Sequence, residues 1–480
     1  MSGLKMKMRK CCWLNLLGLF FLLSGCVAVG PDYVPVSPPA PAQWLGGGED
    51  GLRAQASDES ALASWWAVLE DPLLSELETR MLRGNLSLKE AVQRVREGRA
   101  RRGVAEAKLW PELEVAGSVM TRRDSERSGS GLEHELYAAG FDSSWELDVF
   151  GGRRRGIEAA KAELAADEEG LRDVLVSLTA EVAFNYIAVR TYQARILVAE
   201  ANLVDQQHTY ELNRSRYEAG LLDELAVQQA RYNLEHTRSR IPALRADLTA
   251  AENRLAVLLG ESPGSLAAQL REPRPVPVPP PSVAVGVPAE TLRRRPDVRR
   301  AECELAAQTA RIGVATAERY PKFHLLGSIG LESLQLGDLP EWASRAWLLG
   351  PSISWRIFDA GAIRRDIEVQ TARQEQALLR YEAAVLGALE EVENALTAYT
   401  REQLRRDALN LATTAAGQAV LLARDRYQSG LEDFSNVLDA QRSLLSFQDE
   451  LAVSEGAVAV NLVRIYKALG GGWLPPEEGQ

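Results

Sequence analysis

The residue types that most often carry out catalysis are sparse in this 480-residue chain, and they do not lie in catalytic spacings. The four histidines, at positions 134, 208, 236 and 324, form no short metal-ligand motif. The chain has no glycine-rich phosphate loop and no Gly-x-Ser-x-Gly elbow. Acidic pairs such as Glu390-Glu391 lie in a charged stretch typical of a solvated helix face. We therefore expect no enzyme, no metal site and no cofactor.

Cys26 is the residue whose surroundings predict covalent chemistry. Lysines and one arginine between positions 5 and 10 precede the apolar stretch Cys11–Leu23, which is too short for an ordinary membrane-spanning helix. The stretch leads into Leu23-Ser24-Gly25-Cys26, the pattern of a lipobox, in which a signal peptidase cleaves before the cysteine and the thiol receives a diacylglycerol. An ordinary secretion signal with a chance cysteine is the alternative. Val27, where Asp would retain the chain at the inner membrane, favours anchoring in outer-membrane lipid.

Cleavage before Cys26 defines the charge of the mature chain. It removes four positive charges and no negative ones, so the formal net charge changes from −11 to −15. A chain this acidic is a poor nucleic-acid binder, and we expect no such partner. Cys303 is then the only cysteine besides the acylated Cys26, so no intrachain disulfide is expected.

The elements that follow are duplicated. A gapless shift of 210 residues aligns one half of the chain with the other. Among the matched positions are Trp145 with Trp355, Gly151 with Gly361, Arg216-Tyr217 with Arg426-Tyr427, and Leu259-Gly260 with Leu469-Gly470. Each unit is predicted to contain a helix, two strands, a very long helix and a return helix, which makes the protein mainly α with a small β part.

Two strands are predicted in each unit, at about 111–120 and 136–150 and again at about 321–331 and 346–358. Apolar side chains fall mainly at odd positions in all four, as in Phe141 and Ile329, and polar ones mainly at even positions. A transmembrane β-barrel shows this alternation, and so does a half-buried strand of a soluble sheet. Four strands cannot close a barrel, and open strand edges are prohibitively costly in lipid. If the strands cross a membrane, three chains sharing them would give a 12-stranded barrel.

Each pair of strands is followed by a long helical hairpin, at about 153–260 and 363–470. A helix over 153–217 would extend roughly 100 Å. Gly220 and Gly430 suit helix C-caps, and Asp223 and Asp433 suit N-caps of the return helices. We also expect a local kink at Pro242.

The predicted domain boundaries follow from these elements. They are a signal peptide over 1–25, a lipid-anchored irregular segment over 26–57, repeats over 58–260 and 289–470, a Pro-rich linker over 261–288 and a tail over 471–480. The linker contains Glu272–Pro281, which we expect to be extended and exposed.

These residues resemble the outer-membrane factors of tripartite efflux pumps, the TolC and OprM family, and in particular its lipoprotein, NodT-type branch. The resemblance rests on Cys26 followed by Val29-Gly-Pro-Asp-Tyr33, on Leu292-Arg-Arg-Arg-Pro-Asp-Val298, on the doubled Tyr-x-x-Gly-Leu turn, and on Leu438-Asp-Ala-Gln-Arg442. It implies a homotrimer whose β-barrel crosses the outer membrane and whose α-helical barrel crosses the periplasm. A periplasmic adaptor and an inner-membrane transporter are the implied partners, and the transporter supplies the energy.

The resemblance also implies two functional sites. The turns are expected to contact the adaptor; their residues are Tyr217, Gly220, Leu221 and Asp223 in the first unit, and Tyr427, Gly430, Leu431 and Asp433 in the second. Helix capping alone is the alternative role of these turns. Two acidic rings of a TolC-like pore gate fall on Asn436 and Asp439, with Arg442 one turn further on and able to pair with Asp439. Tyr427 matches a tyrosine of the closing network. That network's arginine and aspartate fall on Glu432 and Ala226, so closure is expected to use other contacts.

The expected function is therefore a passive efflux duct for small molecules such as drugs or metal ions. One alternative is a related duct for type I protein secretion, which would have the same fold and different partners. Another is a lipid-anchored periplasmic coiled-coil scaffold without a pore. The substrates, the transporter class, the resting state and the role of Cys303 stay open.

Overall fold

The computed structural model describes residues 28–36, 41–45, 52–53, 62–127, 129, 131–280 and 283–473. The signal peptide, Cys26 and most of the C-terminal tail lie outside these residues. The chain divides into two compact units. The first unit comprises Met1–Ser37, Arg94–Glu168 and Arg300–Glu382, and the second comprises Pro38–Gln93, Glu169–Arg299 and Ala383–Gln480.

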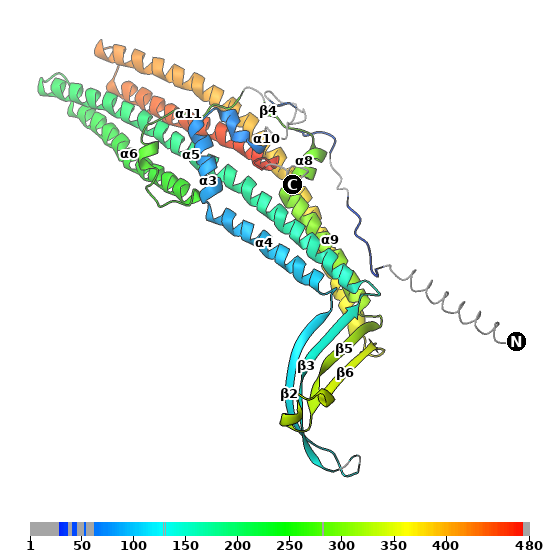
Figure 1. Ribbon diagram of the computed structural model, residues 1–480. Helices are drawn as coiled ribbons and strands as arrows, with labels where there is room; N and C mark the ends of the chain where they lie inside the picture. The colour runs from blue at the N-terminus through cyan, green and yellow to red at the C-terminus, as the bar shows by residue number, and fades with distance from the viewer. Residues whose placement is uncertain are drawn as a thin grey trace. The chain divides into compact units, whose positions relative to one another are not determined.

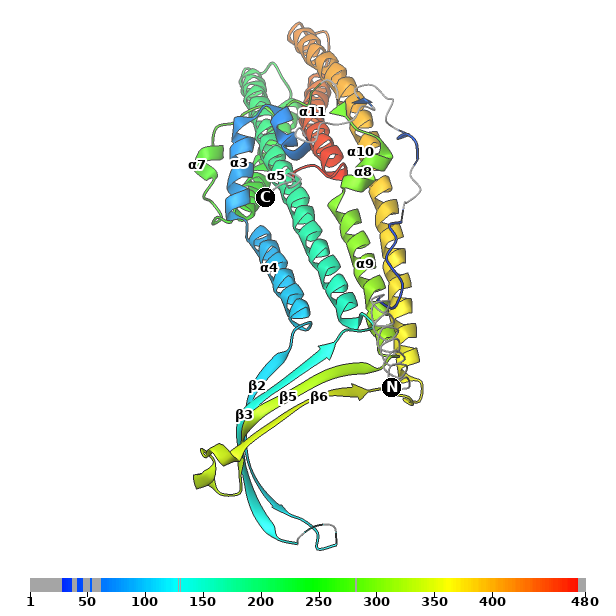
Figure 2. The same ribbon diagram turned by 45° about the vertical axis from the view of Figure 1, so that its right-hand side comes forward.

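The first unit contains a curved, four-stranded antiparallel sheet (Figure 2). Its strands, in the spatial order β2-β3-β5-β6, are β2 (Glu112–Arg123), β3 (Glu133–Leu147), β5 (Lys322–Ser333) and β6 (Arg345–Ser354). The connection between β5 and β6 contains two short 3-10 helices, η2 (Leu336–Asp338) and η3 (Trp342–Ser344). Strands β2 and β6 form the two edges, so within the chain the sheet is open.

The strand register places the odd-numbered apolar residues on one face. Val115, Phe141, Ile329 and Trp347 form one continuous row across the four strands. Their exposures are 74%, 50%, 65% and 78%, so no part of the described chain covers this row. The opposite face carries the row Glu114, Asp142 and Ser328. The predicted alternation is therefore present in β2, β3 and β5, whereas in β6 the apolar Leu348 ends the polar row.

The ends of four helices complete the first unit: α4 (Leu86–Ala107), α5 (Gly152–Glu218), α9 (Pro296–Ala317) and α10 (Ala362–Gln428). The two tryptophans matched by the repeat bind equivalent carbonyls. The indole N–H of Trp145 donates to the carbonyl of Leu109 at 2.8 Å, and that of Trp355 donates to the carbonyl of Arg319 at 3.0 Å. The bonds thus join the ends of β3 and β6 to the residues that directly follow α4 and α9, respectively.

The segment that follows Cys26 is held against the first unit. The backbone N–H of Val29 donates to the carbonyl of Phe150 at 3.0 Å. The buried Arg155 donates to the carbonyl of Val29 at 3.1 Å and to the carboxylate of Asp32 at 2.6 Å. Gly30 has a φ of +92°, and a Cβ there would lie 2.4 Å from the Cα of Gly313. Only glycine fits this contact.

The second unit is built from long helices (Figure 1). Helices α5 and α10 have 67 residues each, and their return helices, α6 (Glu224–Leu258) and α11 (Phe434–Ala468), have 35 each. The bounds of both pairs differ by the 210 residues of the sequence repeat. Helix α6 continues through Pro242 without interruption, and the local kink there stays a prediction.

A single large apolar core holds the second unit together. The short helix η1 (Trp65–Leu69) and α3 (Pro72–Gly84) pack on it together with parts of α5, α6, α10 and α11. Trp65 is fully buried and stacks on Tyr466 with ring centroids 5.6 Å apart. Asp71 caps α3 by accepting the backbone N–H of Leu73 at 2.9 Å. Among the described helices, only α5 contains a window apolar enough to cross a membrane, and 56% of that window is buried in the protein, as in a core helix.

The linker is partly exposed and partly buried. It contains the short helix α7 (Ala267–Leu270) and the strand β4 (Val283–Ala284), and it leads into α8 (Pro288–Arg294). Strand β4 pairs in parallel with β1 (Leu52–Arg53). Leu266, Leu270, Val276 and Pro277 are buried. Within the segment predicted to be exposed, residues 272–275 and Val278 are exposed, whereas the prediction is wrong at Val276 and Pro277, which are buried.

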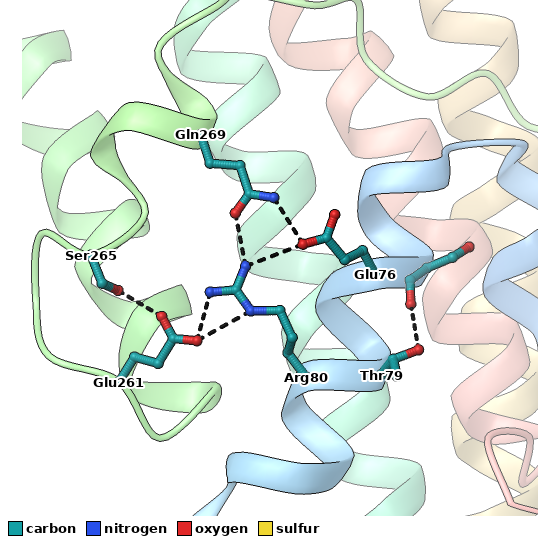
Figure 3. Close-up of polar contacts among 7 residues, drawn as sticks. Glu76, Thr79, Arg80, Glu261, Ser265 and Gln269 are labelled. Atoms are coloured by element: carbon teal, nitrogen blue, oxygen red, sulfur yellow. Dashed lines mark hydrogen bonds and ion pairs between the residues drawn. The ribbon is translucent and has the colours of Figure 1, made fainter.

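Polar contacts fix the first part of the linker to α3 (Figure 3). Arg80 donates to the carboxylate of Glu261 at 2.6 and 3.2 Å and to the side-chain carbonyl of Gln269 at 2.8 Å. The Gln269 amide donates in turn to Glu76 at 3.1 Å. These contacts hold the residues directly after α6 close to the surface of α3.

Candidate docking turns and gate

Both hairpin turns have the geometry of a Schellman cap. Gly220 and Gly430 have φ angles of +72° and +73°, a region that favours glycine. The N–H of Leu221 donates to the carbonyl of Arg216 at 2.8 Å, and that of Gly220 donates to the carbonyl of Tyr217 at 2.9 Å. The same bonds recur 210 residues later, at 2.9 and 3.1 Å. The predicted C-caps are thus present in both copies.

The N-caps of the return helices differ between the copies. The Asp223 carboxylate accepts the backbone N–H of Leu225 at 3.3 Å, as a capping residue should. Asp433 occupies the equivalent extended position, but its side chain makes no capping hydrogen bond. The predicted cap is therefore complete at Asp223 and correct only in position at Asp433.

The leucines of the two turns contribute nothing to capping through their side chains. Leu221 is 76% exposed and Leu431 is 71% exposed, and Tyr217 is also exposed. Capping requires the glycine and the backbone, but it does not require an apolar side chain in water. Two equivalent exposed leucines are therefore available for contact with another protein.

Tyr427 packs into a small apolar cluster near the turns. Its ring lies 5.2 Å from that of Phe434, and its hydroxyl donates to the side-chain oxygen of Asn213 at 3.3 Å. The Arg216 guanidinium lies over the same ring at 5.5 Å. Tyr427 thus joins the two hairpins through Asn213.

The positions that would hold the TolC-like network carry other bonds. Glu432 pairs with Arg426 at 3.0 Å and accepts the amide of Asn436 at 3.1 Å. Asn436 therefore stays within its own hairpin. Ala226 is buried in the apolar cluster beside Phe434 and offers no polar group.

Asp439 and Arg442 lie together on α11. Their closest charged atoms are 3.8 Å apart, and the Asp439 side chain is largely exposed. Arg442 also reaches the first hairpin, where its Nε donates to Asn233 at 3.3 Å and another guanidinium N–H donates to the Tyr232 hydroxyl at 2.5 Å. Arg442 therefore connects an exposed carboxylate to α6.

The Leu292–Val298 motif has a structural role that sequence reasoning did not identify. Buried Arg295 donates to Asp297 at 2.8 and 3.0 Å, to Glu391 at 2.7 Å and to the carbonyl of Ala468 at 2.7 Å. In the first copy, the Asn85 amide makes the corresponding bond to the carbonyl of Leu258 at 2.7 Å. The offset of 210 residues matches position 85 with 295 and position 258 with 468. The repeat in the sequence could therefore have indicated that these two pairs of residues are equivalent.

Comparisons with known proteins agree with this geometry. The sequence model of the family "Outer membrane efflux protein" matches residues 78–261 and 287–471. The chain belongs to the outer membrane efflux protein family. It is 32% identical to nodulation protein T of Rhizobium leguminosarum bv. trifolii, over 95% of this chain and 96% of that protein. It is 31% identical to the cation efflux system protein CusC of Escherichia coli O6:H1, over 94% and 96%.

The solved structure of the outer-membrane channel OprN superposes with a TM-score of 0.88 at 36% identity, covering 93% of this chain and all of that one. The predicted resemblance to the NodT-type branch is thereby confirmed, as are the predicted mainly helical, duplicated fold and the outer-membrane location. This efflux protein is an outer-membrane component of an efflux system.

The described residues hold no group of three or more His, Cys, Asp or Glu side chains that could bind a metal ion.

Proposed function

We propose that three copies of this chain form a passive duct that conducts small molecules through the outer membrane, without catalysing a reaction. The open four-stranded sheet supports this proposal most directly. Its apolar face is uncovered by the described chain, and the outer edges of β2 and β6 are unpaired within the sheet. Lipid would cover the face, and β6 of one copy pairing with β2 of the next would remove the edges.

The dimensions of the apolar face fit a membrane. On β3 the face extends from Tyr137 to Leu147. The ten steps between these two residues extend about 33 Å, or about 25 Å across the bilayer at the usual strand tilt. Trp347 lies level with Phe141 and Ile329, whereas Trp145 and Trp355 lie toward one end of the face and Tyr137 lies at the other. Aromatic girdles occupy these levels in membrane barrels.

The proposed partners follow from the exposed turns and the family. A periplasmic adaptor would contact Tyr217, Gly220, Leu221 and Asp223, together with Tyr427, Gly430, Leu431 and Asp433. The inner-membrane transporter, which we expect to be of the RND type, would deliver the substrate. Relatives are named for the efflux of cations and of toluene. We therefore expect the transporter, rather than the duct, to determine which substrates are exported.

Anchoring by a lipid on Cys26 is part of the proposal. The backbone N–H of Val29 donates to the carbonyl of Phe150, three residues after the end of β3, which would hold the acylated cysteine close to the strands that cross the membrane. A relative is named a probable outer membrane lipoprotein. Cys26→Ser should abolish incorporation of labelled palmitate, and continued labelling would exclude this site.

The proposed gate is the region of Tyr427, Asn436, Asp439 and Arg442. Three exposed Asp439 carboxylates around an axis would repel one another and attract cations. Their distance from the axis would follow the position of α11, which Arg442 ties to α6.

The experiment measures the purified, acylated protein in planar bilayers and, in cells, the entry of vancomycin. The unmodified protein should form heat-modifiable trimers and channels. Asp439→Ala should raise conductance and vancomycin sensitivity, whereas Glu382→Ala, which removes an exposed carboxylate on α10, should change neither. A protein that gives neither trimers nor channels would be a scaffold, and the duct would be refuted. Channels unaffected by Asp439→Ala would refute only the gate assignment.

A further inference from the structure

Helix α11 of the second hairpin contacts the first hairpin through a series of polar bonds. Nearest the turns, the Gln441 amide donates to the Thr209 hydroxyl at 3.3 Å, and Arg442 donates to Asn233 at the same distance. Farther from the turns along α11, Gln448 accepts a hydrogen bond from the Asn202 amide at 2.7 Å. Arg442 makes a second bond near the turns, to the Tyr232 hydroxyl at 2.5 Å, whereas the bonds to Thr209 and Asn233 are long.

The next contact is of a different kind. Asp449 accepts two hydrogen bonds from Arg195 on α5, at 2.8 and 3.1 Å, and one from Arg240 on α6, at 2.6 Å. The Asp449 side chain is only 14% exposed. Burial raises the pKa of Asp449, but the hydrogen bonds and charges of Arg195 and Arg240 outweigh this effect and hold the pKa below its usual value. We call Arg195, Arg240 and Asp449 the carboxylate clasp.

The interface between the clasp and the turns is incompletely satisfied. Six buried side-chain atoms of the described chain have no hydrogen-bond partner there. They are both amide atoms of Gln206, Nδ2 of Asn213, Nδ2 of Asn233, Oγ1 of Thr237 and Oε1 of Gln441. A buried unsatisfied group costs about 1–3 kcal/mol, and water entering on separation would remove this cost.

The interface on the other side of the clasp is apolar. Leu255 on α6 and Val458, Ala459 and Leu462 on α11 belong to the large core of the second unit, and all four are almost fully buried. Separation there would expose apolar surface to water at about 25 cal/mol per Å². Toward the turns, separation would let water reach the six unsatisfied polar atoms, although it would also expose the small apolar cluster of Ala226, Ala230, Phe434, Val437 and Leu438. Away from the turns, separation would expose the large apolar core, so it costs more there.

We propose that the carboxylate clasp is the fulcrum of the gate. The part of α11 between Phe434 and Gln448 separates from α5 and α6 when the duct opens, and Asp449 holds the rest of α11 in place. Arg195, Arg240 and Asp449 are thus positioning residues for the pore, although they lie outside the predicted gate. The inference rests on the proposed function of the chain as a duct.

The first experiment compares Asp449→Asn with the unmodified protein in planar bilayers. Loss of the carboxylate replaces three charge-assisted bonds by weaker ones, so the open fraction should rise roughly tenfold. Arg240→Gln, which leaves the Arg195 pair, should give a smaller rise in the same direction. Glu200→Gln is the matched control, because it removes an exposed bond of 2.8 Å between α5 and α6 without affecting α11. Its channels should be unchanged.

The second experiment locates the movement. Thr209→Cys with Gln441→Cys, in a Cys303→Ser background, places two thiols across the interface on the turn side of the clasp. A short bifunctional thiol reagent should close the channel, both with the native clasp and with Asp449→Asn. Opening that persists in the linked Asp449→Asn protein would overturn the fulcrum, as would an Asp449→Asn channel like the unmodified one. Absence of channels from the unmodified protein would instead overturn the proposed function itself.

Discussion

The two turn glycines show how one backbone angle can decide a local structure. Gly220 and Gly430 lie at positive φ, and a Cβ added to either would meet no atom within 4 Å. The constraint is therefore conformational and does not come from crowding. Gly417, inside α10, has equally open surroundings but helical geometry.

Gly430→Ala should consequently destabilise the hairpin by about 1 kcal/mol, because alanine is strained at positive φ. Gly417→Ala should be neutral or stabilise by up to about 1 kcal/mol, because alanine favours a helix. Thermal unfolding followed by circular dichroism in detergent would measure both. Equal midpoints for the two variants would contradict the conformational explanation.

Glu78 gives a pH-dependent prediction. It is fully buried in α3, its two carboxylate oxygens have no partner among the described residues, and burial raises its pKa well above the usual value. The folded protein therefore binds a proton that the unfolded chain releases above about pH 4.5, so this group costs stability as the pH rises from there toward its folded pKa.

Glu78→Gln should thus raise the unfolding midpoint by roughly 2–8 °C at pH 8, with a smaller gain at pH 5. Glu76→Gln, at an exposed position of the same helix, is the control. A gain from Glu78→Gln that is independent of pH would mean that the carboxyl is not the cause.

At the scale of elements, the sheet offers a test with adjacent residues. Ile329 belongs to the apolar row and Ser328 to the polar face of the same strand. Ile329→Lys should cost about 2–4 kcal/mol if its face meets lipid near the bilayer centre, whereas Ser328→Lys should be tolerated in a water-filled lumen. The amount of each variant in purified outer membranes measures the effect. Equal recovery of both variants would argue against burial of the apolar face in lipid.

The sequence predicted those features that depend on neighbouring residues. The strand alternation, the turn glycines and the offset of 210 are local or periodic patterns, and the structure reproduces all three. The sequence did not predict the burial of the linker at Val276. Nor did it predict the clasp at Asp449, which lies 254 residues from Arg195. Such contacts depend on which distant segments meet, and no local pattern encodes that. The gate and the docking turns stay predictions, because their function depends on an assembly.

At the scale of the whole molecule, duplication preserved the elements and some of their bonds, but not all of them. Helices α4 and α9 differ in their bounds by the repeat offset, yet Asn85 binds one carbonyl where Arg295 binds a carbonyl and two carboxylates. The second copy has therefore become more dependent on a single side chain.

Arg295→Met should lower stability by about 3 kcal/mol, since it leaves Asp297 and Glu391 without their cation. Asn85→Ala should cost about 1 kcal/mol, the usual effect of losing a capping amide. The exposed Arg293→Met serves as the control, and thermal midpoints in detergent rank the three. A smaller loss for Arg295→Met than for Asn85→Ala would contradict this asymmetry.

The open edges of the sheet also constrain how the protein reaches its final state. Strands β3 and β5 join within one chain, but β2 and β6 can be completed only by other copies in the proposed trimer. A lone chain has no low-energy inserted form, so insertion and oligomerisation must be one event. The rate of insertion should then rise more steeply than linearly with the supply of chains. Expression level would control the number of ducts through the kinetics of encounter as well as through the amount of protein made.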